Sequence, residues 1–200
     1  MVQTVRERRR TQTRQEIIDS AWALCREGGL AALSMRELGS RAGLSAPSVY
    51  SYFGSKNEIY DAMFAQGQLE LAEQLAFLPE SRVTRADFRR GAHAFFDFCV
   101  ADPVRYQLMF QRTVPGFEPS PATYALAVAQ VERMARQMTS AGVTDQRHPD
   151  LWTALLSGLT AQQISNDPDG DRWQQLLDEA VDVFCDHAGI PPELPGKDSP

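Results

Sequence analysis

The chain has 200 residues, of which 43% are hydrophobic and 23% are charged, and its net charge is −6. This composition excludes a disordered chain and is typical of one or two globular domains. The charge is uneven, because residues 1–56 contain nine Lys/Arg and five Asp/Glu, whereas residues 57–200 contain eleven and twenty-one. A basic N-terminal part on an acidic remainder is the asymmetry expected when only one part of a protein binds an anionic polymer.

The cysteines and the apolar runs indicate the cellular setting. Cys25, Cys99 and Cys185 are far apart and form no CxxC pair, which favours buried thiols in a reducing compartment over disulfides or a zinc site. No run approaches the ~18 apolar residues that a membrane span requires. The basic N-terminus is followed by polar residues, so the apolar stretch of a signal peptide is missing. We therefore expect a cytoplasmic protein without a membrane segment, a metal or a cofactor.

Capping and stop signals predict four helices in the first third of the chain. Their start signals are Thr13 with Glu16, Ser34 with Glu37, Ser45 with Pro47 in the first turn, and Ser55 with Glu58. Gly28-Gly29 ends the first helix and Gly43 ends the second. Each of these segments carries apolar residues at helical spacing.

The same signals continue through the rest of the chain. Further helices are predicted to start at Thr84, Pro103, Pro121 and Pro149, and after the linker at residues 166–171. Residues 191–200 are rich in proline, which predicts a disordered tail. No stretch alternates with period two for long enough to predict a strand. The sequence therefore predicts an all-α fold of about nine helices without internal repeats.

Residues 34–53, SMRELGSRAGLSAPSVYSYF, contain two short predicted helices separated by Ala42-Gly43-Leu44. Two helices joined by a tight glycine-containing turn form a helix-turn-helix, whose second helix can lie in the major groove of DNA. Four apolar side chains can face inward and fix the crossing of the two helices: Leu38, Leu44, Val49 and Phe53. The segment therefore predicts a DNA-binding element.

Small side chains at the start of the second helix allow its backbone to approach base edges closely. Residues 45–48 are Ser, Ala, Pro and Ser, and the hydroxyl groups of Tyr50 and Tyr52 can reach phosphates or bases. Lys56 adds a cation beside the free backbone N–H groups at the start of the next helix, which predicts a phosphate site.

This part of the chain resembles the tetracycline-repressor (TetR) family of bacterial transcriptional regulators. The resemblance covers roughly residues 12–64, from the amphipathic helix that ends in Gly-Gly to the long fourth helix. In that family the tyrosine and lysine that match Tyr50 and Lys56 contact the DNA backbone, while the start of the third helix reads bases. Pro47 stands where glycine is common and Tyr52 where histidine is frequent, so the resemblance does not identify the operator.

The resemblance implies three functional parts and a set of DNA-binding residues. Residues 1–56 are expected to form the DNA-binding domain, residues 57–190 a helical domain that binds a ligand and dimerises, and residues 191–200 the disordered tail. The predicted DNA-binding residues are Arg14, Ser34, Met35, Arg36, Ser45, Ala46, Pro47, Ser48, Tyr50, Ser51, Tyr52 and Lys56.

The C-terminal part carries two further predicted sites. An apolar ligand cavity is predicted to be lined by Phe95, Phe96, Cys99, Tyr106, Met109, Phe110 and Trp152, which favours a hydrophobic or aromatic effector. The segments at about 149–165 and 171–187 hold more apolar residues than one buried stripe requires, which predicts a four-helix dimer interface. Its predicted residues are Leu151, Leu155, Leu159, Trp173, Leu177, Val181 and Phe184.

Several features have more than one interpretation. Arg8, Arg9 and Arg10 can form either a solvated disordered tail or an arm that follows DNA phosphates. The aromatic residues of the predicted cavity can equally be core residues. His93 lies four residues before Asp97, which favours a surface pair over a metal ligand.

Other classes of protein fit the sequence less well. Cys185-Asp186-His187 contains the residue types of a catalytic triad, but successive helical residues point in different directions, and no known catalytic fingerprint is present. A helical adaptor would show no salt-dependent DNA binding. The sequence therefore predicts a homodimeric transcriptional regulator that is not an enzyme. We expect a repressor that binds a palindromic operator and is released by a small apolar or aromatic effector.

Overall fold

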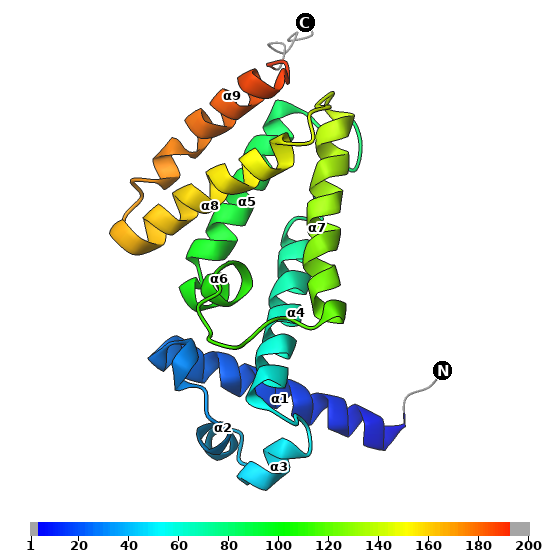
Figure 1. Ribbon diagram of the computed structural model, residues 1–200, viewed down its shortest axis with the longest axis vertical. Coiled ribbons are helices and arrows are strands. Elements are labelled where there is room, and N and C mark those ends of the chain that lie inside the picture. Colours follow the sequence, from blue (N-terminus) through cyan, green and yellow to red (C-terminus); the bar gives the residue numbers. More distant parts are fainter. Residues whose placement is uncertain (1–3, 193–200) are drawn as a thin grey trace, which may run out of the picture. The chain divides into compact units, whose positions relative to one another are not determined.

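The computed structural model of the chain describes residues 4–192, and every regular element within that range is helical (Figure 1). The α-helices are α1 (Val5–Gly28), α2 (Met35–Arg41), α3 (Ala46–Tyr50), α4 (Lys56–Gln74), α5 (Arg85–Val100), α6 (Pro103–Phe110), α7 (Pro121–Ser140), α8 (His148–Asn166) and α9 (Leu177–Ala188). Two short 3₁₀ helices, η1 (Leu30–Ala32) and η2 (Gln174–Leu176), complete the set. The predicted all-α fold is confirmed. None of the described helices is long and apolar enough to cross a membrane.

Helix α1 starts nine residues earlier than the sequence predicts, at Thr4 rather than Thr13. The hydroxyl oxygen of Thr4 accepts a hydrogen bond from the backbone N–H of Glu7 (3.3 Å), and the Glu7 carboxylate accepts one from the backbone N–H of Thr4 (2.8 Å). This reciprocal capping box opens the helix, so Thr13 lies inside it and the predicted start at Thr13 is wrong. Residues 8–10 consequently belong to α1 rather than to a disordered tail or arm.

The described chain divides into two compact units. The first contains residues 4–68 and Val104–Leu126, and the second contains Leu69–Pro103 and residues 127–192. The division falls within α4 and α7, so the compact units do not follow the boundary after residue 56 that the sequence predicts. The assignment of functions to residues 1–56 and 57–190 stays a prediction. Residues 193–200, most of the predicted tail, lie outside the described residues.

The core of the first unit joins the helix-turn-helix to the helices that support it. Buried apolar residues from α1, α2, α3 and α4 pack in one cluster, to which α6 contributes Leu108. At the centre of this cluster Leu38, Val49 and Phe53 are completely buried. Leu44, predicted to face inward with them, is partly buried and packs against the cluster edge. Burial of these side chains fixes how α2 and α3 cross.

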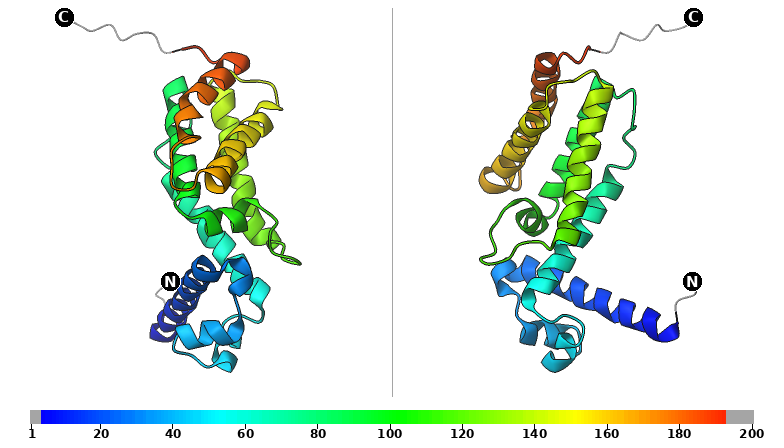
Figure 2. Two further views of the ribbon diagram at one scale, coloured as in Figure 1. Left: turned by 90° about the vertical axis from the view of Figure 1, so that its left-hand side faces the viewer. Right: turned by 45° about the vertical axis from the view of Figure 1, so that its right-hand side comes forward.

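The core of the second unit is built around aromatic side chains of α5, α8 and α9. The ring centroid of Trp152 lies 4.7 Å from that of Phe184 and 5.5 Å from that of Phe88, the latter in an edge-to-face arrangement. All three rings are buried. Figure 2 shows α8 and α9 side by side in this unit.

The predicted continuous helix over 171–187 is wrong at its start. Trp173 precedes η2, and α9 begins only at Leu177. The buried side chain of Gln163 determines this turn, because its Oε1 accepts hydrogen bonds from the backbone N–H groups of Trp173 (3.0 Å) and Gln174 (3.3 Å). A glutamine that binds backbone ten residues away leaves no periodic signal in the sequence.

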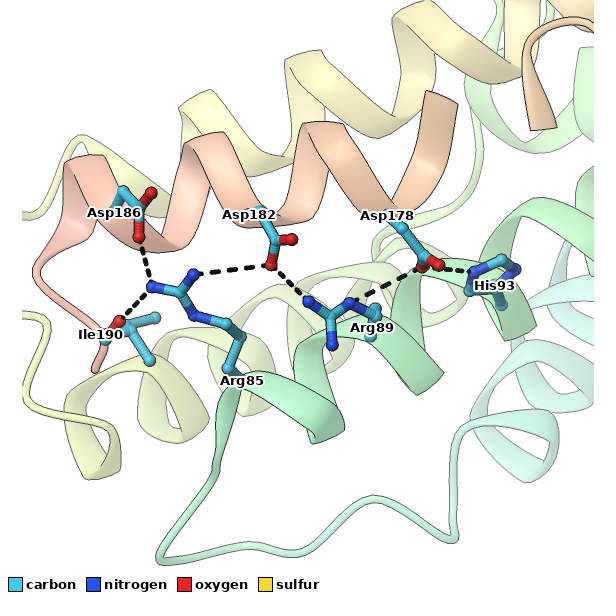
Figure 3. Close-up of polar contacts among 7 residues, drawn as sticks. All are labelled: Arg85, Arg89, His93, Asp178, Asp182, Asp186 and Ile190. Atoms are coloured by element: carbon cyan, nitrogen blue, oxygen red, sulfur yellow. Dashed lines mark hydrogen bonds and ion pairs between the residues drawn. The ribbon is translucent and has the colours of Figure 1, made fainter. Parts of the chain in front are cut away.

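Charged residues on α5 and α9 form a ladder along the line where these helices pack (Figure 3). We call the six residues Arg85, Arg89, His93, Asp178, Asp182 and Asp186 the charge ladder. Arg85 donates from Nη2 to Asp186 Oδ1 (2.5 Å) and to the carbonyl oxygen of Ile190 (2.7 Å). Both sets are spaced four residues apart, so each helix presents its charges on one face.

The ladder also corrects the predicted partner of His93. Its Nε2 lies 2.9 Å from Oδ1 of Asp178 on α9, rather than beside Asp97 on its own helix. Asp97 instead accepts a hydrogen bond from the side chain of Gln174.

Candidate nucleic-acid interface

The turn between α2 and α3 depends on a close backbone approach. Ser34 caps α2 by accepting a hydrogen bond from the backbone N–H of Glu37 (3.2 Å). Gly43 follows α2 with φ at +67°, a conformation that favours glycine. A Cβ atom on Gly39 would lie 2.9 Å from the carbonyl oxygen of Leu44, so only glycine fits there without a shift of the backbone. Sequence reasoning missed Gly39, whose only signal is a glycine inside a predicted helix.

Helix α3 begins with two serines whose side chains interact. Ser45 Oγ accepts a hydrogen bond from the backbone N–H of Ser48 (3.3 Å), and the two hydroxyl oxygens lie 2.8 Å apart. Ser45 and Pro47 are exposed, whereas Ala46 and Ser48 are partly buried. The predicted N-cap and the predicted proline in the first turn are confirmed. The exposed surface at this end of the helix is therefore small and polar.

Aromatic and cationic side chains lie around the C-terminal end of α3. Tyr50 is 54% exposed, while Tyr52 is partly buried. The hydroxyl of Ser51 donates to the carbonyl oxygen of Ser48 (2.7 Å). Arg14 is exposed on α1, but its Nη1 donates to the carbonyl oxygen of Tyr52 (2.8 Å). A predicted DNA contact thus also binds the chain just after α3.

Lys56, the first residue of α4, is partly buried with its Nζ 5.4 Å from the ring centroid of Tyr60. The two carboxylates nearest to Lys56 in the sequence, those of Glu58 and Asp61, bind other groups. Glu58 accepts a hydrogen bond from the backbone N–H of Gly54 (2.8 Å), and Asp61 accepts one from the backbone N–H of Ser120 (2.7 Å). Tyr60 is buried and donates to the carbonyl oxygen of Leu30, and its burial raises the pKa of the phenol to about 12. The Lys56 ammonium therefore lies against a neutral ring at physiological pH.

The residues predicted at the start of α2 differ in exposure. Arg36 is exposed, whereas Ser34 and Met35 are partly buried and Met35 packs against the core. Arg41 at the end of α2 forms an ion pair with Glu27 (2.6 Å), which neutralises its charge. Of the predicted DNA-binding residues Ser34, Met35 and Arg36, only Arg36 is therefore exposed.

Residues 17–63 match the sequence model described as bacterial regulatory proteins, tetR family. The matched segment contains α2, the turn, α3 and Lys56. The chain belongs to the TetR family of transcriptional regulators. Members of this family are DNA-binding proteins rather than enzymes.

Similarity to individual proteins extends beyond the matched segment. HdnoR of Paenarthrobacter nicotinovorans, an HTH-type nicotine-responsive transcriptional repressor, is 26% identical over 196 residues, covering 88% of this chain and 96% of HdnoR. FasR of Mycolicibacterium smegmatis, an HTH-type transcriptional activator, is 31% identical over 103 residues, covering 51% of this chain and 47% of FasR. This chain therefore spans about half the length of FasR. The crystal structure of the regulatory protein SCO4313 has a TM-score of 0.75 at 25% identity and covers 90% of this chain and 98% of that one.

The predicted ligand residues of this TetR-family chain fall into both compact units. Phe95, Phe96, Cys99 and Trp152 belong to the second unit, whereas Tyr106, Met109 and Phe110 belong to the first. Phe110 is 39% exposed, and Trp152 is packed against other rings as described above. Their joint role in a cavity stays a prediction.

Three of the predicted dimer residues are core residues of the single chain. Leu177 and Val181 are completely buried and Phe184 is 2% exposed, so these side chains have no surface left for a second copy. This corrects the prediction for these three positions. Leu151 is 45% exposed, while Leu155, Leu159 and Trp173 are partly buried. Their contribution to a dimer remains a prediction.

The residue cluster with triad-like composition has a structural role. Cys185 is buried, and burial raises the pKa of its thiol to about 11. Asp186 is paired with Arg85 in the charge ladder. Within residues 4–192 no three His, Cys, Asp or Glu side chains have the arrangement of a metal site.

Proposed function

We propose that this TetR-family chain is a ligand-responsive repressor that binds a palindromic operator as a homodimer through α3. The observation that carries the proposal is the composition of the exposed surface around α3. Small polar residues lie at its N-terminal end, Tyr50 is its exposed last residue, and Lys56 lies six residues further along the chain. Small groups allow close approach to base edges, and the larger polar groups are suited to phosphates.

In this proposal Ser45, Pro47 and Ser48 face the major groove, while Tyr50, Tyr52 and Lys56 bind phosphates on the rim of the groove. Arg14, Arg36 and the remaining predicted contacts lie on the flanking parts of α1, α2 and the segment that follows α3. Phosphate contacts set the register of the helix, and base contacts select the sequence. A regulator of this kind acts in the cytoplasm, where bacterial DNA lies.

The similarity to HdnoR supports a repressor that responds to a small molecule. HdnoR is by its name a nicotine-responsive repressor, and it matches this chain over most of its length. FasR is by its name an activator, but it matches only about half of this chain. Residues 57–190 would bind the effector, and the aromatic and methionine side chains predicted there favour an apolar or aromatic molecule.

The proposed dimer uses the exposed apolar side chains of α8 and α9. Leu151 on α8 and Val183 on α9 are 45% and 64% exposed, in addition to the partly buried Leu155 and Leu159. Light scattering at micromolar concentration is expected to give a species of twice the 22.3 kDa chain mass. The double variant Leu151→Asp/Val183→Asp should be monomeric and folded. A wild-type protein that remains a monomer at this concentration contradicts the dimer.

The ligand response requires two states, because an effector can only shift an equilibrium if it binds one dimer geometry more tightly. The test is a gel-shift assay with duplex DNA from upstream of the protein's own gene and with a random duplex of equal length. Stronger binding to the upstream duplex, reversed by one of a panel of small aromatic compounds, supports the proposal. Equal affinity for both duplexes at every salt concentration contradicts operator binding.

A further inference from the structure

Helix α3 is too short to be stable by itself. It spans five residues, Ala46–Tyr50, and an isolated helix of that length does not form in water because nucleation outweighs the few hydrogen bonds gained. Its N-terminus is capped by Ser45, and Val49 anchors one face in the core. The segment after its C-terminus needs donors for carbonyl groups that no longer have helical partners.

Two arginines of α1 supply donors at that end. Arg10 Nη2 donates to the carbonyl oxygen of Ser51 (3.1 Å), and Arg14 Nη1 donates to the carbonyl oxygen of Tyr52 (2.8 Å). The two arginines are four residues apart on α1, so they lie on the same helix face. They therefore bind two consecutive peptide groups directly after α3.

The same guanidinium groups also contact the aromatic rings of this segment. The Cζ atom of Arg10 lies 5.3 Å from the ring centroid of Tyr52, and that of Arg14 lies 4.0 Å from the ring centroid of Phe53. Phe53 is completely buried, so the ring beneath Arg14 is fixed in the core. A planar guanidinium can stack on a ring and donate at its edge simultaneously, which a lysine ammonium cannot do.

We propose that Arg10 and Arg14 are positioning residues that hold the C-terminal end of α3 in the orientation required to discriminate between DNA sequences. We call this pair the arginine clamp. The inference rests on the proposed function, because it assigns the clamp a role in operator recognition. Tyr50 directly precedes the two clamped carbonyl groups and Tyr52 carries one of them, so the clamp fixes the side chains proposed to set the register of α3 on the phosphates.

The arginine clamp should affect DNA affinity differently from positive charge alone. Binding to random DNA depends on charge and tolerates a misplaced helix, whereas base readout requires correct placement. Loss of the clamp should therefore lower affinity for a preferred duplex more than affinity for a random one. Loss of charge alone should lower both affinities together.

The first experiment measures backbone protection without DNA. Amide hydrogen exchange is compared in the wild type, Arg10→Met/Arg14→Met, Arg10→Lys/Arg14→Lys and Arg9→Met. Arg9 is exposed in the same turn, and its replacement removes one charge without touching the clamp. In the Met double variant, exchange across residues 46–53 should accelerate by about tenfold, as expected for the loss of two hydrogen bonds. The Arg9→Met variant should exchange like the wild type. Exchange around Ile59 and Met63 of α4, which are buried in the core of the same unit, should be unchanged in every variant, which shows that this unit remains folded.

The second experiment measures discrimination between DNA sequences. A duplex selected by the wild type from a random library is compared with an unselected duplex by fluorescence anisotropy. The Lys double variant retains both charges but not the clamp, so the ratio of its affinity for the selected duplex to its affinity for the unselected duplex should fall by about tenfold relative to the wild type. Arg9→Met should weaken binding to both duplexes by the same factor.

Unchanged exchange in the Met double variant overturns the clamp, and so does a Lys double variant with wild-type discrimination. A wild-type protein that selects no duplex overturns the proposed function and, with it, the role of the clamp in recognition. The exchange experiment still decides in that case whether the two arginines hold α3.

Discussion

Ser45 and Ser48 lie on the first turn of α3 with their hydroxyl oxygens 2.8 Å apart, and Ser45 Oγ also accepts the backbone N–H of Ser48. The side chain proposed to read bases therefore also caps the helix that presents it. A substitution at Ser45 changes both roles, whereas a substitution at Ser48 leaves the capping acceptor in place. These two effects can be separated experimentally.

Ser45→Ala should lower the free energy of unfolding by about 1 kcal/mol, because a helix N-cap is lost. Ser45→Asp should retain most of the stability, since aspartate is a good N-cap, but should abolish DNA binding by repelling phosphates. Ser48→Ala should change stability by less than Ser45→Ala. Urea unfolding curves measure the first quantity and anisotropy titrations the second. Equal stability of the wild type and Ser45→Ala would refute the capping role.

Lys56→Ala should weaken binding to selected and random DNA alike, because phosphates carry no sequence information. A dimer has two such lysines, so the slope of log affinity against log salt concentration should decrease by roughly two units. Arg136→Ala is the matched control, because it removes an exposed charge of the second unit. Unaltered slope and affinity in Lys56→Ala would exclude a phosphate contact.

Two neighbouring arginines of the charge ladder, Arg85 and Arg89, are expected to contribute unequally to the free energy of unfolding. The Arg85 side chain is only 9% exposed, and it is a donor to the carbonyl oxygen of Ile190. Arg85→Met should lower the free energy of unfolding by about 1–3 kcal/mol, because a buried acceptor loses its partner. The Arg89 side chain is 35% exposed, so Arg89→Met should lower it by less than about 1 kcal/mol. Urea unfolding curves measure the free energy of unfolding of both variants. Equal decreases in Arg85→Met and Arg89→Met would show that burial does not determine the contribution of these arginines.

Asp87 predicts a pH dependence of stability. Burial disfavours its carboxylate, but hydrogen bonds from the backbone N–H and hydroxyl of Thr84 and from Arg90 outweigh burial, so its pKa is lowered. A group with a lowered folded-state pKa contributes stability above its unfolded pKa of about 3.9 and loses that contribution as the pH falls through the folded pKa. The stability difference between the wild type and Asp87→Asn should therefore be constant from pH 7 to about 5 and shrink below about 4. A difference that grows in acid would show that the pKa is raised instead.

The helix-turn-helix could be predicted from the sequence because its signals are local. Capping serines and a turn glycine stand within a few residues of the backbone groups that they satisfy. The start of α1 is not predictable in this way. Thr4-Glu7 and Thr13-Glu16 both have the spacing of a capping box, and only Thr13-Glu16 directly precedes an apolar run, so the sequence favours the wrong pair. The arginine clamp was missed because its acceptors are carbonyl groups about 40 residues away.

The predictions for the C-terminal part of the chain also fail where a residue's partner is distant in the sequence. Apolar residues of α9 predict burial, but they do not reveal whether the partner is the same chain or a second copy. Leu177, Val181 and Phe184 pack within the chain because α5 and α8 already cover that face. His93 has a carboxylate four residues away in sequence, yet it pairs with Asp178 because the packing of α5 on α9 brings that carboxylate to 2.9 Å from its Nε2. Tertiary partners of this kind have no periodic signature.

Selection of duplexes from a random library by the wild-type protein tests the central claim, that α3 reads DNA as part of a symmetric dimer. We predict enrichment of inverted half-sites whose centres are about 34–36 Å apart along the DNA axis or a multiple of that distance. Ser48→Ala should change the enriched bases within each half-site while the spacing is retained. Enrichment of a single unpaired site, or of no sequence at all, would contradict the account.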